Sequence, residues 1–549
     1  MKKFICFLSF CVLLGTISAF AAIDKNPIMR VGLYYEEDAV AVAKLQNIKG
    51  SGYRLGFFDS KRNFISLLST GLTKIAVAKD ANLSHKNAIF YESGAPAGSK
   101  SLGAFHVESS AKYANAGAAE AAVKSFQKLG YYAFPAYIQN TWRVRIGSFT
   151  STAAADTLKS KIGGTVVGNS KTCVTVYASE SGSALFEYDG GTYTCLGVYP
   201  SLNTAAMPLT WFKSMQWYGG FEYPRNGGNM TIVNVVPMQY YIKGVIPYEM
   251  SPDSPLEALK AQAMCARTYA YYNTGKHGRL FDVCCTTDCQ VYFGAERASN
   301  NSDRAVDETQ GKYILYDGEP INAVFHSADG GATEDVENIW GSFIPYLRGK
   351  VDPYEDLEHA LNGIWSYEYT PQELTDILNA KGYKAALISD AYVAEYTKLG
   401  NVLKVVFVDV NGKEWPFMRE RARTIINSTS MKKYTRSQRY TIKRTGSAGG
   451  GMINVNGTAT INPFDGKTAV IGSGGIITIS PDGKLSVITA NGKESIKSAA
   501  GSSGNFIISG TGWGHNVGMS QEGAAGMAKK GFLAEDIIHF YFTGVTITK

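Results

Sequence analysis

The hydrophobic pattern between residues 101 and 178 repeats once, and this repeat constrains the fold more than any other feature. Each half begins with a strand-like segment, continues into a helical segment and returns to a strand. Strands are expected at 105–109, 131–139, 141–146 and 165–167, and helices at 114–129 and 151–162. The β-α-β-β-α-β order predicts a small ferredoxin-like unit, in which two helices cover one face of an antiparallel sheet.

The second half of this unit carries a short motif. It reads WRVRIGSF at 142–149 and is followed by AAAD at 153–156. This segment resembles the second half of a SPOR domain, a class of domain that binds peptidoglycan glycan strands stripped of their stem peptides. The resemblance implies a glycan-binding domain over residues 101–178. A ferredoxin-like packing domain without a ligand is the alternative.

The first 21 residues have the order of a secretory signal peptide. Lys2 and Lys3 precede an apolar run over 4–17, and small residues close the run at 19–21. We expect cleavage after Ala21, because the apolar run is short for a membrane span. No later segment approaches the roughly 20 apolar residues of a transmembrane helix. The sequence therefore predicts a secreted, cell-wall-associated protein without a transmembrane segment in its mature form.

Length and charge set further bounds. A chain of 549 residues suggests about three or four domains. The formal net charge of +7 suits an anionic cell wall. Nucleic acid is not an expected partner for an exported chain of this kind.

The remaining residues divide into two parts. Residues 22–100 alternate apolar and polar residues and predict a small β-rich N-terminal region. Residues 190–549 read as one larger domain, with an inserted group of β-hairpins at the Gly- and Ser-rich segment 446–505. A disordered linker is the alternative for that insertion.

A long helix is expected after Ser254, because SPLE at 254–257 has the pattern of a capping box with proline at the first helical position.

Four separated segments of the larger domain concentrate polar residues in Gly-rich or strand-ending contexts. They read EM at 249–250 with EALKAQAMCARTY at 257–269, CQVY at 289–292, FHSADGGAT at 325–333, and GTGWGHNVGMSQEGA at 510–524. This ordered set resembles the SpoIID/LytB family of bacterial peptidoglycan-active proteins, over roughly 190–445 and 500–545. The resemblance implies an α+β, multidomain fold with a β-rich SpoIID-type catalytic domain. It also implies a role in wall remodelling during sporulation or engulfment.

Glu249 is the expected catalytic acid and base, since the resemblance places the catalytic glutamate of the family at this position. It ends a strand-like run among the apolar neighbours Ile246, Tyr248 and Met250. Enclosure by these side chains would raise the pKa of its carboxyl and keep it protonated. One such acid suffices for a lytic transglycosylase, because the 6-hydroxyl of the muramic acid attacks the anomeric carbon. A glutamate that caps or salt-bridges the next helix is the alternative.

Nine further residues are expected to bind substrate through their amide, hydroxyl, guanidinium, ring or backbone groups. They are Arg267, Gln290, Tyr292, Ser327, Gly331, Thr333, Trp513, His515 and Gln521. Arg267 can hold a stem-peptide carboxylate or pair with an internal acid. Gln290 and Tyr292 alternate on a strand-like run and therefore face one way. His515 can hold Glu249 or the sugar, and a structural histidine is the alternative.

His277, Cys284, Cys285, Asp288 and Cys289 lie close together in the sequence. The resemblance makes a metal site one alternative here, because some members of the family bind zinc near this region with two histidines and two cysteines. Asp288 stands where that pattern has histidine, and the spacing from Cys284 is one residue short. A disulfide between Cys289 and Cys284 or Cys285 suits an exported protein equally well. The sequence therefore commits to no cofactor, and zinc near Cys284 and Cys289 stays an alternative.

These features predict an exported lytic transglycosylase that cleaves denuded peptidoglycan glycan strands. The SPOR-like domain would raise the local concentration of the same polymer. A different class of function is a non-catalytic wall-binding protein that enhances a partner N-acetylmuramoyl-L-alanine amidase. A third alternative is a hydrolase that uses Cys289 as nucleophile together with His515.

Overall fold

The computed structural model describes residues 23–202, 204, 206–356, 363–445 and 504–548, together with the backbone of six short strands between 453 and 495. The predicted signal peptide lies outside the described residues. The described chain is a mixed α+β, multidomain protein, as the sequence predicts. Among the described residues, none of the helices has the length and apolar character needed to cross a membrane.

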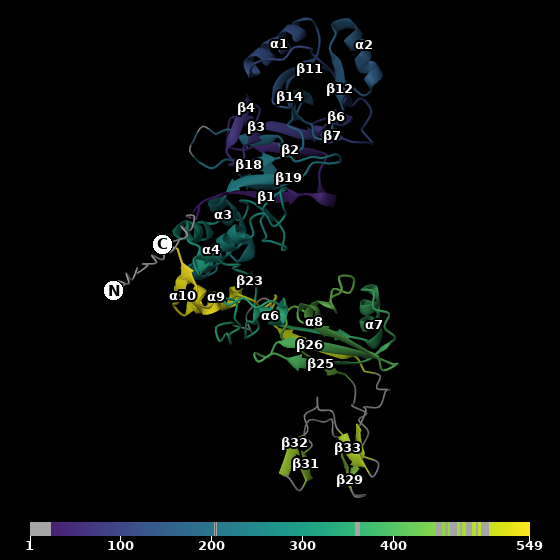
Figure 1. The fold of residues 1–549 in the computed structure, drawn as a ribbon, viewed down its shortest axis with the longest axis vertical. Coiled ribbons are helices and arrows are strands. Elements are labelled where there is room, and N and C mark those ends of the chain that lie inside the picture. Colours follow the sequence, from purple (N-terminus) through teal and green to yellow (C-terminus); the bar gives the residue numbers. More distant parts are fainter. Residues whose placement is uncertain are drawn as a thin grey trace, which may run out of the picture.

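The repeated unit has the predicted β-α-β-β-α-β order. Its elements are β9 (Phe105–Glu108), α1 (Ala116–Lys128), β10 (Ala133–Ile138), β11 (Thr141–Phe149), α2 (Thr152–Ile162) and β12 (Thr165–Gly168). The side chains of Asn115 and Ser151 cap the two helices by accepting backbone N–H groups. Both helices pack against strands of this unit and lie at one end of the molecule (Figure 1).

The sheet of this unit continues into the rest of the protein. From β10 it runs through β14 (Ser183–Asp189), β13 (Val174–Ala178), β5 (Lys74–Lys79), β2 (Val42–Asn47), β16 (Leu209–Phe212) and β17 (Met215–Tyr218). β10 and β14 pair in parallel, and β13 and β5 pair antiparallel. Ten hydrogen-bonded strands therefore join the repeated unit to segments on both sides of it in the sequence.

A seven-stranded sheet also combines early and late segments. Its order is β20 (Val283–Cys284), β1 (Ile28–Tyr34), β19 (Ile232–Pro237), β18 (Gly220–Glu222), β15 (Gly197–Pro200), β3 (Tyr53–Phe58) and β4 (Phe64–Thr70). Within this early part of the chain, β2 pairs with β5 and β3 pairs with β4, but both pairs belong to the larger sheets. A separate three-stranded sheet contains β6 (Leu83–Lys86), β7 (Ile89–Tyr91) and β8 (Lys100–Leu102). The division expected at residue 100 therefore does not separate two sheets, because an alternating pattern identifies a strand but not its partner.

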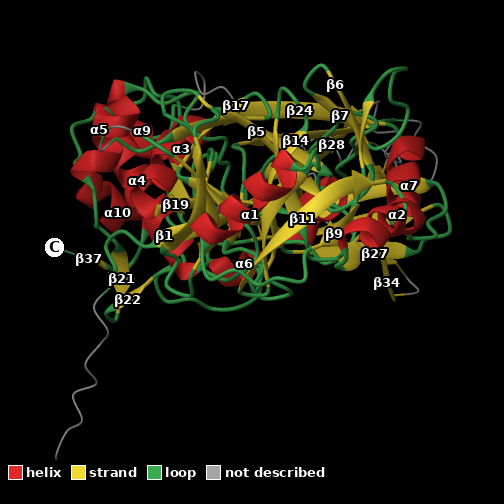
Figure 2. Cartoon of the chain, turned by 90° about the horizontal axis from the view of Figure 1, so that it is seen from above, coloured by secondary structure: helices red, strands yellow, loops and turns green. Residues whose placement is uncertain are grey.

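Five helices form a layer beside the seven-stranded sheet. They are α3 (Met238–Glu249), α4 (Leu256–Tyr272), α5 (Asn300–Glu308), α9 (Gln521–Lys529) and α10 (Ala534–Tyr541), and they gather at one side of the molecule (Figure 2). The strand expected before Glu249 is wrong, since this segment is the helix α3 with Pro247 inside it. Most side chains of α3 are buried, so its sequence lacks the polar face that reveals a helix.

The start of α4 also differs from the expected capping box. The N-cap is Pro255, and no side chain caps the helix. Glu257 instead accepts the backbone N–H of Ala534 at 2.9 Å, at the start of α10. The acidic residue of the expected box therefore holds two helices together, and the first turn of α4 is supported by tertiary contacts.

A second hydrophobic core is formed by buried residues between Trp365 and Ile508. It contains β24 (Ile364–Tyr369), α7 (Pro371–Ala380), β25 (Ile388–Tyr396), β26 (Val402–Asp409), β27 (Glu414–Met418), α8 (Glu420–Thr424), β28 (Tyr440–Arg444) and β35 (Phe506–Thr511). Within the expected hairpin insertion, three antiparallel pairs are described. They are β29 (Ile453–Val455) with β30 (Ala459–Ile461), β31 (Ala469–Gly472) with β32 (Gly475–Thr478), and β33 (Ser486–Thr489) with β34 (Gly492–Ser495). The other residues of 446–503 lie outside the described residues.

The chain returns from this unit to the helical layer. β36 (Met519–Ser520) pairs in parallel with β23 (Phe325–His326), next to the short helix α6 (Val336–Ile339). β21 (Ile314–Tyr316), β22 (Glu319–Pro320) and β37 (Thr546–Ile547) form another small sheet. The pairing of β23 with β36 brings the third and fourth polar motifs of the sequence side by side.

Candidate functional site

Glu249 is the last residue of α3, and its carboxyl is half-buried. Its Oε1 accepts the backbone N–H of Val291 at 2.7 Å. Burial raises the pKa of Glu249, although hydrogen bonds from Val291 and the Gln521 side chain oppose this shift. The structure therefore places a partly desolvated carboxyl with a raised pKa at the end of a rigid helix.

The fourth motif reaches Glu249 through the N-terminus of α9. Gln521 is the first residue of this helix and hydrogen-bonds the Glu249 carboxyl. Ser520 caps the helix, with its side chain accepting the Gly523 N–H at 3.1 Å. The carbonyl of Ser327 accepts the Glu522 N–H at 3.0 Å. These contacts link all four motifs, because Val291 and Gln521 bond to Glu249 and Ser327 bonds to the residue after Gln521.

A groove of about 590 Å³ lies next to the segments that hold Glu249, although Glu249 itself is not one of its lining residues. Tyr248 and Val291, the sequence neighbour and the hydrogen-bond partner of Glu249, both line it. Its aromatic walls are Trp211 and Phe293, which are 39% and 37% exposed. The sequence offered no sign of these two aromatic residues, because they lie outside the polar motifs and only the folded chain brings them to Glu249.

The groove has a charged continuation. Trp211 and Ser214 also line a second hollow of about 540 Å³, which contains Lys44, Lys74 and Lys213. Lys74 pairs with Glu180 at 3.0 Å, and Lys213 lies 4.2 Å from the centre of the Tyr34 ring. The two hollows together form an extended surface with aromatic side chains near Glu249 and ammonium groups beyond them.

Four of the expected substrate-binding residues are buried. Arg267 is fully buried and contacts the Gln239 side chain and the Val306 carbonyl, each at 3.3 Å. Gln290 accepts the Tyr241 hydroxyl at 3.0 Å, and Tyr292 donates to Asn234 at 2.7 Å. Thr333 accepts the Lys350 N–H at 2.9 Å. Contrary to expectation, these polar groups satisfy internal partners, and Gln290 and Tyr292 face the core together.

His515 is also held internally. Its Nδ1 accepts the Val517 N–H at 3.1 Å, and the ring hydrogen-bonds the backbone of Phe325. Burial, with His326 and Arg423 nearby, lowers the pKa of His515 well below its ordinary value, so the imidazole is neutral. This geometry favours the structural alternative for His515 and leaves it without a free ring nitrogen for Glu249 or Cys289.

Three other expected residues remain accessible. Trp513 is 43% exposed, with the Arg436 guanidinium 4.4 Å from its ring centre. Ser327 is half-buried beside the start of α9. Gly331 adopts a φ of 115°, which suits glycine, and its carbonyl accepts the Asp352 N–H at 3.0 Å. These residues can contact a ligand, together with Gln521.

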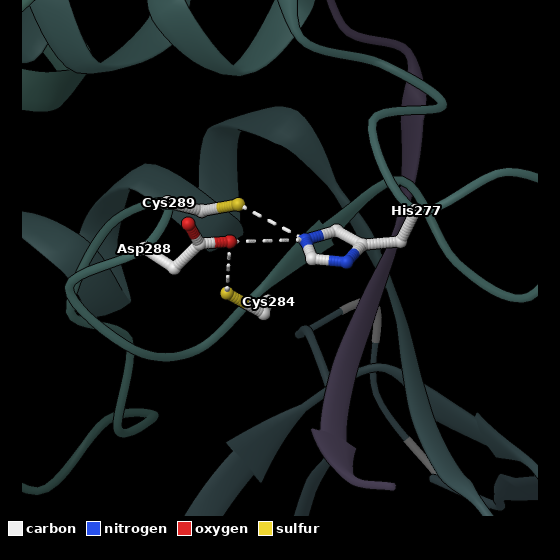
Figure 3. Close-up of side chains that lie close together, drawn as sticks. All are labelled: His277, Cys284, Asp288 and Cys289. Carbon is white, nitrogen blue, oxygen red and sulfur yellow. Dashed lines mark hydrogen bonds and ion pairs between the residues drawn. The ribbon is translucent and has the colours of Figure 1, made fainter. Parts of the chain in front are cut away.

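His277, Cys284, Asp288 and Cys289 point toward one another, and their ligand atoms all lie within 4.8 Å of each other (Figure 3). His277 Nε2 is 3.3 Å from Cys289 Sγ and 3.7 Å from the Asp288 carboxylate. A hydrogen bond from Cys289 lowers the pKa of Cys284 to about 4. One nitrogen, one oxygen and two sulfurs at these separations fit a tetrahedral zinc site.

Cys285 takes no part in this cluster. Its Sγ lies 3.6 Å from the Leu33 carbonyl, on the other side of the chain. None of the six cysteines of the described residues forms a disulfide. The expected alternative of a disulfide with Cys285 therefore does not fit the structure.

Two known families match separate ranges of the chain. Residues 226–316, which include Glu249, Val291 and the cysteine cluster, match the family described as stage II sporulation protein. Residues 103–175 match the SPOR domain. The chain carries a SpoIID domain and a SPOR domain. The SPOR match coincides with the repeated β-α-β-β-α-β unit, so the resemblance drawn from the sequence is confirmed.

Relatives that align with more than half of this chain have different names. The chain is 29% identical over 339 residues to an uncharacterized protein of Brachyspira hyodysenteriae, covering 61% of this chain and 73% of that protein. It is 30% identical over 327 residues to the amidase enhancer of Bacillus subtilis, covering 56% of this chain and 40% of the enhancer. It is 27% identical over 335 residues to stage II sporulation protein D of Bacillus amyloliquefaciens, covering 58% of this chain and 76% of that protein.

Proposed function

We propose that this protein is an exported peptidoglycan lytic transglycosylase that acts on denuded glycan strands in cell-wall remodelling during sporulation. The observation that carries this proposal is the raised pKa of Glu249, whose neighbour Tyr248 and hydrogen-bond partner Val291 line an aromatic groove. The SPOR domain and the relatives named as sporulation proteins support a substrate in the cell wall.

The proposed reaction uses one carboxyl in two steps. Protonated Glu249 donates its proton to the glycosidic oxygen as the bond to the anomeric carbon breaks. The resulting carboxylate accepts the proton of the muramic acid 6-hydroxyl as this oxygen bonds to the same carbon. The products are a 1,6-anhydro end and a free 4-hydroxyl end, and no water is consumed. Gln521 and the Val291 N–H hold the carboxyl in place through both steps.

The groove supports a polymeric, anionic sugar as substrate. Trp211 and Phe293 offer flat apolar faces on which sugar rings can stack. Each muramic acid of a strand without stem peptides carries a free lactyl carboxylate. Lys44 and Lys213 in the adjoining hollow can attract these carboxylates.

Product analysis tests the reaction directly. The mature protein is incubated with denuded glycan strands, and the fragments are identified by mass spectrometry. We expect anhydro-muramic ends. Reducing muramic ends would instead indicate hydrolysis, and uncut strands would contradict an enzymatic role.

The relative named amidase enhancer supports a second candidate, a wall-binding protein that stimulates a partner amidase. This candidate predicts faster release of stem peptides when the protein is added to an N-acetylmuramoyl-L-alanine amidase and intact sacculi. Stimulation that survives in a variant unable to cut strands would favour it.

Substitution of Trp211 by alanine tests the groove. Loss of the stacking face should weaken glycan binding by about tenfold, equivalent to about 1.4 kcal/mol. The change should appear in KM more than in kcat, because Trp211 would stack on the sugar and take no part in the proton transfer. Tyr272→Ala removes an exposed aromatic residue that lines neither hollow and serves as the control. Equal effects of the two substitutions would argue against the groove.

We also propose that the cysteine cluster holds a structural zinc ion. His277, Cys284, Asp288 and Cys289 would supply its ligands. Metal analysis of the purified protein should give one zinc per chain, and Cys289→Ser should lower both the zinc content and the Tm. Cys285→Ser should retain zinc, since Cys285 points away from the cluster. A mass 2 Da below that of the reduced chain, without zinc, would identify a disulfide instead.

A further inference from the structure

Three acidic side chains outside the proposed reaction lie together beneath the N-terminus of α9. Asp329 comes from the turn after β23, and Asp352 and Glu355 come from the segment after α6. One carboxylate oxygen from each lies within 4.8 Å of the other two. Asp329 is 0% exposed and Asp352 is 4% exposed, while Glu355 is half-buried.

Protein donors already surround these carboxylates. Glu355 accepts the backbone N–H groups of Asp329 and Gly330 at 2.6 and 2.7 Å, as well as the Ser520 hydroxyl. Asp352 accepts the Tyr354 N–H and the Tyr541 hydroxyl. Such donors favour the ionised form of a carboxyl group, whereas burial and the neighbouring carboxylates raise the pKa values of Asp329 and Glu355. The carboxylate oxygens of Asp352 and Glu355 therefore act as hydrogen-bond acceptors.

The negative charge of this cluster lacks a partner among the described residues. No lysine or arginine of the described ranges forms an ion pair with any of the three carboxylates. Oδ2 of Asp329 is buried and has no hydrogen-bond partner in this part of the chain. Buried charges are costly unless a counter-charge or a metal compensates them. Either a bound cation or protons shared between the carboxyl groups must therefore compensate the negative charge of the cluster.

We propose that Asp329, Asp352 and Glu355 bind one hard divalent cation of the Ca²⁺ or Mg²⁺ class. Oxygen donors alone suit these ions, whereas zinc prefers the nitrogen and sulfur donors of the separate cluster at His277. The unpartnered Asp329 Oδ2 would be one ligand, with Asp352 and Glu355 completing the protein share. The half-buried Glu355 gives the ion a route from solvent.

The position of the cluster gives the ion a structural role. Glu355 holds the hydroxyl of Ser520, the N-cap of α9, and the next residue is Gln521. Gly523 in the same turn lies so close to Asp352 and Tyr541 that an added Cβ would be 2.1 Å from Asp352 Oδ2. The ion would therefore fix the end of α9 that faces Glu249.

Calcium and magnesium binding to the full mature protein tests the proposal without any activity measurement. After removal of bound metal, calorimetric titration with each ion alone should give one site per chain, and saturation should raise the Tm by several degrees. Tb³⁺ bound there should show luminescence sensitised by Tyr541, and excess Ca²⁺ should quench it. Failure of both ions to bind at millimolar concentration would overturn the proposal and leave shared protons as the compensating charge.

Variants assign the site. Asp352→Asn should weaken Ca²⁺ binding by at least tenfold, while Asp376→Asn, an exposed acid on α7, should leave it unchanged. If Asp352→Asn does not fold, Asp329→Asn provides the same comparison, and the Tb³⁺ signal of the unaltered protein remains decisive. Binding that survives in both cluster variants would place the ion elsewhere and contradict the assignment.

Discussion

Replacement of Glu249 by glutamine should lower the rate of glycan-strand cleavage by about 10²–10⁴-fold, the usual contribution of a general acid and base. Glutamine keeps the shape of the side chain and can still meet Val291 and Gln521, but it has no proton to donate. The measurement is the rate at which anhydro-muramic ends form from denuded strands at saturating substrate. Binding of the strands should change little, since Glu249→Gln removes the chemistry and not the groove.

Glu296→Gln is the matched control, because Glu296 is an exposed carboxylate that lines the same groove. This variant should retain most of the activity if a single acid carries the reaction. A loss equal to that of Glu249→Gln would instead indicate a two-carboxylate hydrolase. The two variants therefore separate the transglycosylase from the ordinary glycosidase mechanism.

The raised pKa of Glu249 determines in which direction the cleavage rate changes with pH. Burial raises this pKa above the ordinary value of 4.5, and the donating form is the protonated one. Cleavage should therefore decline as the pH rises through the raised pKa. The desolvated carboxylate also costs folding free energy above its unfolded pKa, so Glu249→Gln should be at least as stable as the parent protein at neutral pH.

Replacement of Arg267 by alanine should destabilise the protein by about 3–5 kcal/mol, as for other large side chains removed from a core. The guanidinium is fully buried between α3, α4 and α5, and burial lowers its pKa to about 10. Arg267→Met should cost less, because methionine fills much of the space and removes a buried charge that forms no ion pair within the described residues. Chemical denaturation followed by tryptophan fluorescence measures both changes.

Activity distinguishes this structural role from the expected substrate role. A guanidinium that bound a stem-peptide carboxylate would be needed for substrate recognition, and Arg267→Met would then raise KM. We expect the cleavage rate per folded molecule to be unchanged in Arg267→Met. A large rise in KM with normal stability would restore the interpretation of Arg267 as a ligand-binding residue.

The sequence predicts the elements of the SPOR domain well because its two helices are amphipathic and separately capped. The same reasoning fails at α3, where Tyr241, Ile242, Val245 and Ile246 are all buried. A helix surrounded by protein lacks the polar face on which the periodicity argument depends. Strand partners such as β1 and β19 are also invisible in sequence, because their pairing joins residues about 200 positions apart.

The candidate site is only partly predictable for a related reason. The polar motifs identify Glu249 and Gln521, which the fold brings together. They also contain Arg267, Gln290 and Tyr292, whose polar groups bond inside the core. Residue type gives the chemistry of a side chain, whereas its orientation depends on the packing of distant segments. Trp211 and Phe293 could be assigned to the groove only from the folded chain.

The ten-stranded sheet has a consequence for how the protein would move along the wall. The SPOR domain joins the body through paired strands β10, β14, β13 and β5, and not through a flexible tether. The distance between the SPOR domain and Glu249 is therefore fixed by the fold. If the SPOR domain holds a strand and Glu249 cuts it as proposed, each cut should fall at a set number of sugars from the held segment.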